Sequence, residues 1–230
     1  MSTFGEIVEP VSRTTWEDWD EVYAEENVTI IQWQLPIEIP KRIETLFILE
    51  GKFLSDFMKV QSRDFFKLIN SNIGVNLHLY QLTSSDKYIC TVKDYNLLKS
   101  SEIIELLKPF IYKSEDVITI QTKPIMEYQT ASLGMQSWVI RQLTTSVPSK
   151  KTWDLNFAKL EQPNILSGVT AGAICLREHI NLSATALVCY IEHIEEYQTN
   201  ELLKLLEKFE IIDDTCSAKC SGILSSNLYI

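Results

Sequence analysis

Several residue types are scarce in this 230-residue chain, and each scarcity excludes a class of protein. Glycine and proline number seven each, which is too few for a disordered or low-complexity protein. Acidic residues outnumber basic ones by 31 to 21, and the resulting net charge of −10 would repel the phosphates of a nucleic acid. The apolar and charged fractions are those of a folded protein, so we predict one large domain.

Signals for export and membrane insertion are also missing. The first residues, Met1–Glu6, lack the basic region and apolar core of a signal peptide. The longest mostly apolar run, Ile165–Leu176, is too short to cross a bilayer. The five cysteines are an odd number, which argues against a disulfide framework. The odd count favours a reducing compartment, and we expect a cytoplasmic protein with no membrane insertion. Cys90, Cys175 and Cys189 lie among apolar residues, so we interpret them as core residues.

Hydrophobic periodicity divides the chain into interleaved strands and helices. Alternating or β-branched runs predict strands over residues 28–35, 45–49, 74–82, 87–92, 117–122, 138–143 and 184–191. Apolar faces predict helices over residues 52–69, from 101 onward, 164–179 and 200–212. Strands and helices that alternate without a repeat predict an α/β fold, a single-domain sandwich of a mixed β-sheet with helices on both faces.

The starts of two helices carry more specific predictions. Ser101 and Asn164 are candidate N-caps, because their side chains can accept hydrogen bonds from the first free backbone amides. Gly168 and Gly172 lie one turn apart inside the helix predicted to follow Asn164. Glycine lowers helix propensity, so we expect these two positions to allow very close packing against the sheet.

We divide the chain into three segments. Residues 1–27 form an acidic N-terminal segment, residues 28–212 the α/β domain, and residues 213–230 a flexible C-terminal tail without helical periodicity. The N-terminal segment places Trp16 and Trp19 among carboxylates, and these tryptophans either pack back on the domain or contact a partner.

No group of residues has the spacing of a catalytic, nucleotide or metal site. None of the seven glycines forms a phosphate-binding loop after a strand. Cys216 and Cys220 have a three-residue spacer and no obvious second pair to complete a zinc site. Cys189 and His193 are more simply a core cysteine and a surface histidine than a nucleophile and its base. We therefore expect no enzymatic activity, no cofactor and no metal.

The C-terminus carries the strongest functional candidate. Leu228, Tyr229 and Ile230 place a hydrophobic residue, a tyrosine and the terminal carboxylate at the end of the tail. A receptor can pair with that carboxylate while neighbouring pockets hold the preceding side chains. Extended from Asp213, the tail would reach about 60 Å. The residues alone favour equally a tail that folds back and buries Leu228 and Ile230.

Three segments resemble the 20S proteasome assembly chaperones. They are Thr3-Phe-Gly-Glu-Ile-Val8, the stretch Leu160-Glu-Gln-Pro-Asn-Ile165 with the helix and apolar strand behind it, and Ser226-Asn-Leu-Tyr-Ile230. Between residues 10 and 135 the similarity is one of pattern and spacing. The resemblance implies an α/β sandwich related to the phosphorylase/hydrolase-like folds, without enzymatic activity.

The resemblance also implies partners and a mechanism. It implies a heterodimer with proteasome assembly chaperone 2 that binds proteasome α subunits, promotes formation of the α-ring and prevents off-pathway α-ring dimers. The family's hydrophobic–tyrosine–any-residue (HbYX) motif falls on Leu228, Tyr229 and Ile230, which would enter pockets between α subunits. The implied location is cytoplasmic, with nuclear or endoplasmic-reticulum association as further options.

Two alternatives remain open at this point. One is a small-molecule enzyme of the same fold, which would need a polar pocket with convergent titratable groups at the strand ends. The other is an unrelated scaffold protein with a buried tail.

Overall fold

The computed structural model describes residues 31–60, 65–83, 85–130, 138–149, 151, 153, 156–191 and 196–212. Contacts between Cα atoms divide the chain into two units, 1–30 and 31–230, and all described residues belong to the second. The predicted N-terminal segment 1–27 and tail 213–230 lie outside the described residues.

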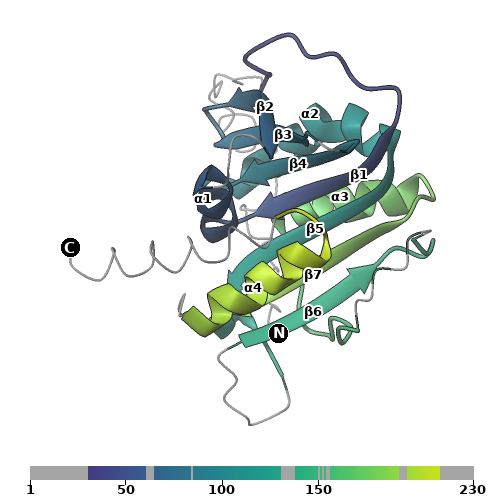
Figure 1. Ribbon diagram of the computed structural model, residues 1–230. Coiled ribbons are helices and arrows are strands. Elements are labelled where there is room, and N and C mark those ends of the chain that lie inside the picture. The colour runs from purple at the N-terminus through teal and green to yellow at the C-terminus, as the bar shows by residue number, and fades with distance from the viewer. Residues whose placement is uncertain are drawn as a thin grey trace, which may run out of the picture. The chain divides into compact units, whose positions relative to one another are not determined.

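Seven strands of the described chain form one mixed sheet in the order β2-β3-β4-β1-β5-β7-β6 (Figure 1). The strands are β1 (Ile43–Glu50), β2 (Phe66–Asn72), β3 (Leu77–Leu82), β4 (Lys87–Val92), β5 (Ser114–Pro124), β6 (Trp138–Thr144) and β7 (Ala184–Ile191). The four central strands β4, β1, β5 and β7 run parallel, while β2, β3 and β6 pair antiparallel at the two sides.

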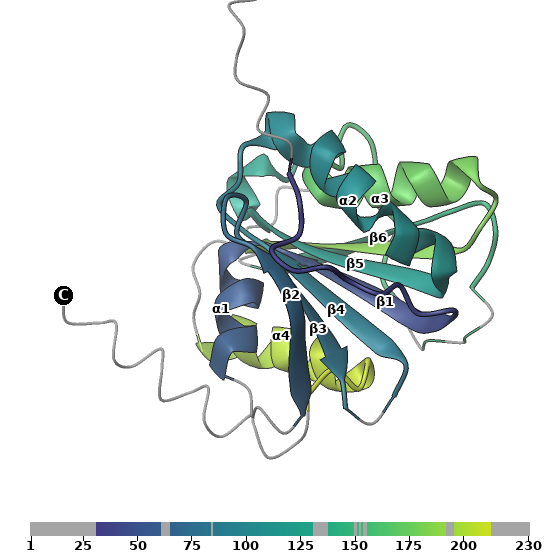
Figure 2. The same ribbon diagram turned by 90° about the horizontal axis from the view of Figure 1, so that it is seen from above.

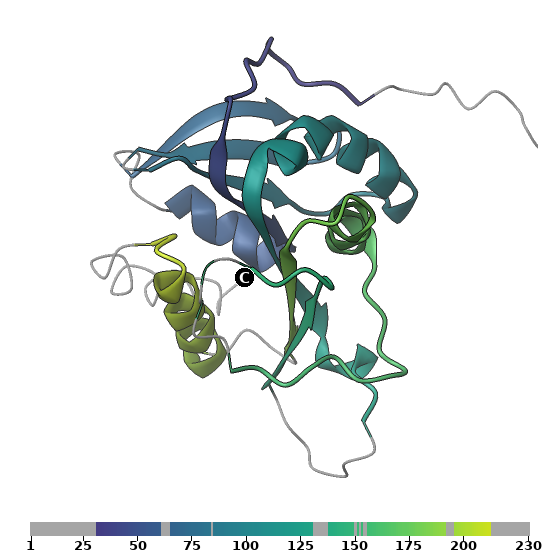
Figure 3. The same cartoon turned by 90° about the vertical axis from the view of Figure 1, so that its right-hand side faces the viewer.

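Helices cover both faces of the sheet. They are α1 (Lys52–Val60), α2 (Ser100–Lys113), α3 (Gly168–His179) and α4 (Glu196–Lys208), with short 3₁₀ turns η3 (Leu97–Lys99) and η4 (Ile125–Glu127). Figure 2 shows α2 and α3 on one face and α1 and α4 on the other, and Figure 3 shows the same two layers from the side. The predicted α/β fold, with one mixed sheet between two helical layers, is confirmed.

Each face of the sheet has its own hydrophobic core. All eight residues of β7 are buried, which explains its unbroken apolar sequence, because a strand covered on both faces has no solvent side. Leu202, Leu206 and Phe209 of the α4 segment pack into one core, and Ile103 and Phe110 of α2 pack into the other. The apolar faces predicted for these helices are therefore confirmed.

The helix predicted over residues 52–69 is too long. Helix α1 ends at Val60, and strand β2 begins at Phe66. Leu68, expected on the apolar helix face, is 53% exposed and pairs with Tyr80 of β3. Pairing with β3 outweighs the helical period here, because strand pairing depends on distant residues that a local pattern does not contain.

The edge strand predicted over residues 28–35 is absent from its described part, residues 31–35. This stretch instead lies along β2. The amide of Gln34 donates to the carbonyl of Ser71 at 3.1 Å. The Asn70 side chain donates to the carbonyl of Leu35 at 2.6 Å and accepts from its amide at 3.2 Å. One sheet edge is thus partly covered without a regular ladder.

The two predicted N-caps are wrong. Asn96 rather than Ser101 caps the helical segment, accepting from the amide of Leu98 at 3.0 Å, and η3 runs directly into α2 at Ser100. Asn164 lies before α3 and exchanges two hydrogen bonds of 2.8 Å with the backbone of Gln129. Asn96 thus starts the helical segment upstream of the predicted cap Ser101. Asn164 fixes the path of the chain before α3 instead of capping that helix.

The two glycines of α3 have different roles from the predicted one. Gly168 begins the helix with a φ of 71°, a left-handed conformation that favours glycine. A Cβ atom at Gly172 would lie 2.7 Å from Cγ1 of Ile104 in α2. The close packing that Gly172 permits is therefore against a neighbouring helix, not against the sheet.

Candidate functional site

The predicted site residues Leu228, Tyr229 and Ile230 lie outside the described residues, so their role stays a prediction. The described chain ends at Ile212, directly before the tail. Phe209 and Ile211 are fully buried and Ile212 is 5% exposed. The described chain therefore ends at a well-anchored point on the α1/α4 side of the sheet (Figure 1).

An ion pair holds this point. The ammonium of Lys87, whose side chain is 5% exposed, pairs with the carboxylate of Glu210, just beyond α4. The hydrogen bond and charge of Lys87 lower the pKa of Glu210, so the carboxylate is ionised at neutral pH. Phe209 adds an edge-on contact with Trp153, with ring centroids 5.2 Å apart.

A polar cluster fills the carboxyl ends of the central strands, where sheets of this type hold ligands. The carboxylate of Glu50, at the end of β1, accepts from the amide of Thr170 at 2.8 Å. The Tyr95 hydroxyl donates to Glu50 and accepts from the amide of Val169 at 2.9 Å. Burial and the hydrogen bond to Glu50 raise the pKa of Tyr95, which keeps its hydroxyl protonated.

This arrangement closes the N-terminus of α3 to outside anions. The first amides of a helix attract a negative group, and here Glu50 supplies it from within the chain. A Cβ atom at Gly168 would overlap both the Glu50 carboxylate and the Tyr95 hydroxyl. The space is therefore filled by the protein's own side chains, and the cluster stabilises the fold.

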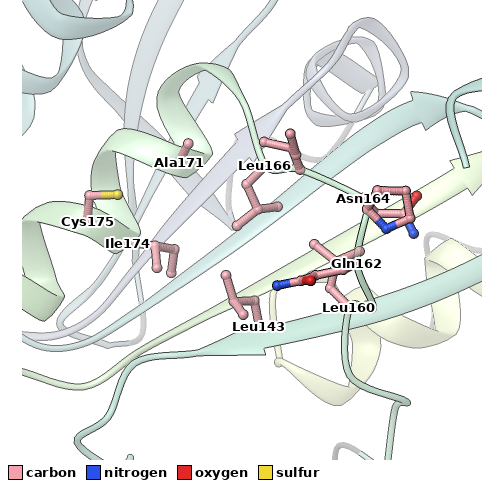
Figure 4. Close-up of a pocket in the computed structure, with 10 residues that line it drawn as sticks. Leu143, Leu160, Gln162, Asn164, Leu166, Ala171, Ile174 and Cys175 are labelled. Atoms are coloured by element: carbon pink, nitrogen blue, oxygen red, sulfur yellow. The ribbon is translucent and has the colours of Figure 1, made fainter. Parts of the chain in front are cut away.

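An apolar groove of about 680 Å³ lies on the outer side of α3, between β6 and the segment 160–166 (Figure 4). Its lining includes Leu143, Leu160, Pro163, Leu166, Ile174 and Cys175. The polar groups among its lining residues are the amides of Gln162 and Asn164 and the thiol of Cys175.

Helix α3 divides its residues between the core and this groove. Val169, Ala173 and Arg177, spaced four apart, are buried. Ala171 and Cys175, also four apart, line the groove. Cys175 is exposed, so its predicted place in the core is wrong, while Cys90 and Cys189 are buried as predicted.

Hydrogen bonds hold the segment that forms the other wall. The amide of Gln142 in β6 donates to the carbonyl of Ala158 at 2.9 Å, and its carbonyl accepts from the amide of Leu160 at 2.8 Å. Residues near 158–160 thus cover part of the second sheet edge. Further along, Lys123 donates to the carbonyl of Ile165 at 3.2 Å.

Glu161 ties the same wall to β6 and to the residues after η4. It accepts from Arg141 at 2.9 Å and from the Tyr128 hydroxyl. Desolvation acts to raise the pKa of Glu161, but the hydrogen bonds from Tyr128 and Arg141 outweigh it and lower the pKa. The Arg141 guanidinium also lies 5.0 Å from the centre of the Tyr128 ring.

The groove is suited to packing rather than to catalysis. Apart from the Cys175 thiol, none of its lining residues has an ionisable side chain, so the groove lacks the paired acid and base that such catalysis uses. Within the described ranges, no three His, Cys, Asp or Glu residues converge in a way that could hold a metal ion. No helix in this part of the chain is long and apolar enough to cross a membrane.

The sequence had indicated one wall of this groove but not the other. The stretch Leu160–Ile165 stood out through its resemblance to the chaperones, whereas Leu143 and Cys175 did not stand out at all. The available signal was the pair of small residues Ala171 and Cys175 at helical spacing, on a side of α3 that packs against neither the sheet nor α2.

Sequence comparisons identify no relative: no protein-family model and no curated protein matches the chain. Solved structures do match. Pyrococcus furiosus PbaA, described as an archaeal homolog of proteasome-assembly chaperone, has a TM-score of 0.56 at 12% identity over 82% of this chain and 87% of its own. A protein of unknown function from Thermoplasma acidophilum has a TM-score of 0.58 at 8% identity, covering 82% and 86%.

A third structure broadens the functional range of this fold. Pyrococcus furiosus PbaB, described as an archaeal proteasome activator, has a TM-score of 0.50 at 10% identity over 84% of this chain and 96% of its own. At such identities the likeness concerns the fold alone. The chain thus has the α/β fold of archaeal proteasome-assembly chaperone homologues, a fold that an archaeal proteasome activator shares.

Proposed function

We propose that this chain is a non-enzymatic chaperone of 20S proteasome assembly that corresponds to proteasome assembly chaperone 1. It acts in the cytoplasm as a heterodimer with proteasome assembly chaperone 2, promotes α-ring formation and prevents off-pathway α-ring dimers. The observation that carries the proposal is the shared fold with PbaA over most of both chains. The resemblance of Leu160–Ile165 and of the C-terminus to the chaperones adds to it.

The proposed contact with the ring is the C-terminal motif. Leu228, Tyr229 and Ile230 dock into pockets between α subunits, with the terminal carboxylate paired to a lysine. The buried anchor at Ile212 supports this role, because it fixes where the tail begins relative to the domain. From there the tail has a reach of about 60 Å, and attachment to a docked domain raises its effective concentration.

A proteasome activator is the second candidate, because PbaB shares the fold. The HbYX motif would serve either role. An enzyme is less well supported, because Glu50 and Tyr95 fill the strand ends where a ligand would bind. A scaffold with a buried tail would leave Tyr229 and Ile230 without a receptor.

Affinity purification from the source cell tests the proposal. The tag must be at the N-terminus, because the proposed motif needs a free carboxylate. We expect α subunits and a second small α/β protein, with β subunits below the ratio found in mature particles. An activator would instead recover α and β subunits in equal proportion. Recovery of neither kind of subunit contradicts both candidates.

A further inference from the structure

We propose that the groove between β6, the segment 160–166 and α3 is the surface that binds the second subunit of the chaperone heterodimer. Its occupant is a segment of that subunit that presents apolar side chains followed by a basic residue. This inference rests on the proposed function and adds to it the surface and the chemistry of the contact.

The first argument is the amount of apolar surface around the groove. Ile165 is 76% exposed and Leu143 is 38% exposed. Met126 of η4 is 92% exposed, and its neighbours Lys123 and Gln129 both bond to the 160–166 wall. Exposed apolar side chains in and near an apolar groove are typical of a protein-binding surface.

The second argument is that the groove is already formed. The 160–166 wall is held to β6 by the backbone hydrogen bonds of Gln142 and by the bond from Arg141 to Glu161, and it is held to Gln129 by Asn164. A preformed surface loses little conformational entropy when it binds, so more of the apolar burial contributes to affinity.

The third argument is the charge at the end of the groove. Glu178 follows Ile174 and Cys175 by one turn of α3 and accepts from the Ser146 amide at 2.7 Å and from the Ser146 hydroxyl. These hydrogen bonds lower the pKa of Glu178, and both come from neutral groups. In contrast, Glu161 is paired with Arg141 and Glu127 with Lys123. A basic group on the occupant would compensate the charge of Glu178.

The same charges disfavour a second copy of this chain as the occupant. Each copy carries a net charge of −10, so two copies repel each other before contact. The groove also lies on the α2/α3 side of the sheet, whereas the described chain ends at Ile212, beyond α4 on the opposite side (Figure 2). A subunit bound in the groove therefore lies on the face of the sheet opposite to Ile212.

Cys175 provides a direct reporter, because it is exposed in the groove while Cys90 and Cys189 are buried. In a full-length chain with Cys216→Ser and Cys220→Ser, maleimide labelling of Cys175 is followed with and without excess proteasome assembly chaperone 2. We expect the heterodimer to slow labelling by about tenfold or more, because the thiol lies in the centre of the contact.

Substitutions test the same surface by affinity. Cys175→Arg places a long charged side chain in the groove and should weaken the heterodimer by about tenfold or more. Glu178→Gln should weaken it by about threefold, and the loss should shrink in high salt. The matched control is Asn200→Arg, an exposed position on α4, which should leave the affinity unchanged.

The outcomes separate this inference from the proposed function. If the heterodimer forms without protecting Cys175, and if Cys175→Arg leaves its affinity unchanged, then the groove is not the contact surface. The proposed chaperone function would still stand. If size exclusion shows no heterodimer at all, the proposed function is overturned, and the groove inference loses its proposed binding partner. If Cys175 becomes protected as the concentration of this chain alone is raised, the groove binds a second copy of the chain, and the proposal is overturned.

Discussion

The inner and outer sides of helix α3 differ in how they use polar and apolar groups. On the inner side Arg177 and Thr170 are fully buried, and the Glu50 carboxylate lies against the first turn. On the outer side Cys175 is exposed and faces an open apolar groove. The strand ends where related sheets hold small ligands are thus closed by structural contacts, and the open outer side is the surface that we propose for another protein.

Removing the inner contacts should have the largest effect. Arg177 donates five hydrogen bonds to the carbonyls of Ile111, Ser114, Glu115 and Ser183. Burial lowers its pKa to about 10, partly offset by Asp116, and the guanidinium stays charged at neutral pH. We expect Arg177→Met to lower the free energy of unfolding by about 3–5 kcal/mol, because buried carbonyls lose their donors.

Urea unfolding of the full chain measures this loss. The control is His179→Ala, two residues further along α3 at an exposed position, for which we expect a change within about 0.5 kcal/mol. Similar losses in the two variants would mean that the inner side of α3 does not carry more of the stability than the outer side.

The cluster at the start of α3 should rank next. Glu50→Ala removes the acceptor of the Thr170 amide and of the Tyr95 hydroxyl. We expect a loss of about 2–3 kcal/mol in the free energy of unfolding, because a helix cap and a buried hydrogen bond are lost together. Glu50→Gln keeps an acceptor oxygen and should lose about 1 kcal/mol.

Thermal unfolding of the two variants side by side provides the measurement. Equal destabilisation by Ala and Gln would show that the hydrogen bonds of Glu50 contribute little and that its volume matters more. If anions such as phosphate stabilised Glu50→Ala but not the wild type, the interpretation of Glu50 as the group that closes this helix end would be sharpened.

The same contrast explains which features the sequence could predict. The bounds of β4 and β7 were predicted to the residue, because a hairpin turn and a run covered on both faces leave a local pattern. Strand β2 was not predicted at all, and neither was the role of Asn164, because both depend on hydrogen-bonding partners that are distant in the sequence. The groove was not predicted, because its walls meet only in the folded chain; only the stretch Leu160–Ile165 had been singled out.

The tail and the groove should also be separable by mutation. Deleting Tyr229 and Ile230, or adding residues after Ile230, should reduce recovery of α-ring intermediates by about tenfold, because the motif and its carboxylate are lost. The fold and the heterodimer should be unaffected. Pull-down of α subunits and of proteasome assembly chaperone 2 by both forms is the measurement.

A matched control for the truncation is Asn227→Ala, which alters the tail but keeps the three motif residues and the terminal carboxylate. Equal recovery of α subunits by the truncated and complete chains contradicts the tail hypothesis. Loss of the second chaperone on truncation would instead show that the tail and the heterodimer contact are coupled.

The smallest expected effect concerns pH at the rim of the groove. Hydrogen bonds from the Ser146 hydroxyl and amide lower the pKa of Glu178 below its ordinary value of 4.5. A lowered pKa in the folded state stabilises the fold above the ordinary value, and the contribution is lost as pH falls through the lowered one. Ser146→Ala removes the first of these bonds, so the difference in unfolding free energy between wild type and variant should be present at neutral pH and shrink below pH 4.5.

Urea unfolding at a series of pH values measures that difference, with the exposed Ser101→Ala of α2 as a variant whose effect should not depend on pH. Because the ionised form of Glu178 is the one that attracts a basic occupant, heterodimer affinity should weaken over the same acidic range. A wild type and a Ser146→Ala variant whose stability curves stay parallel down to acidic pH would contradict the role of Ser146. The charge of Glu178 would then not depend on hydrogen bonds from Ser146. The outer side of α3 would differ from the inner side only in its apolar surface.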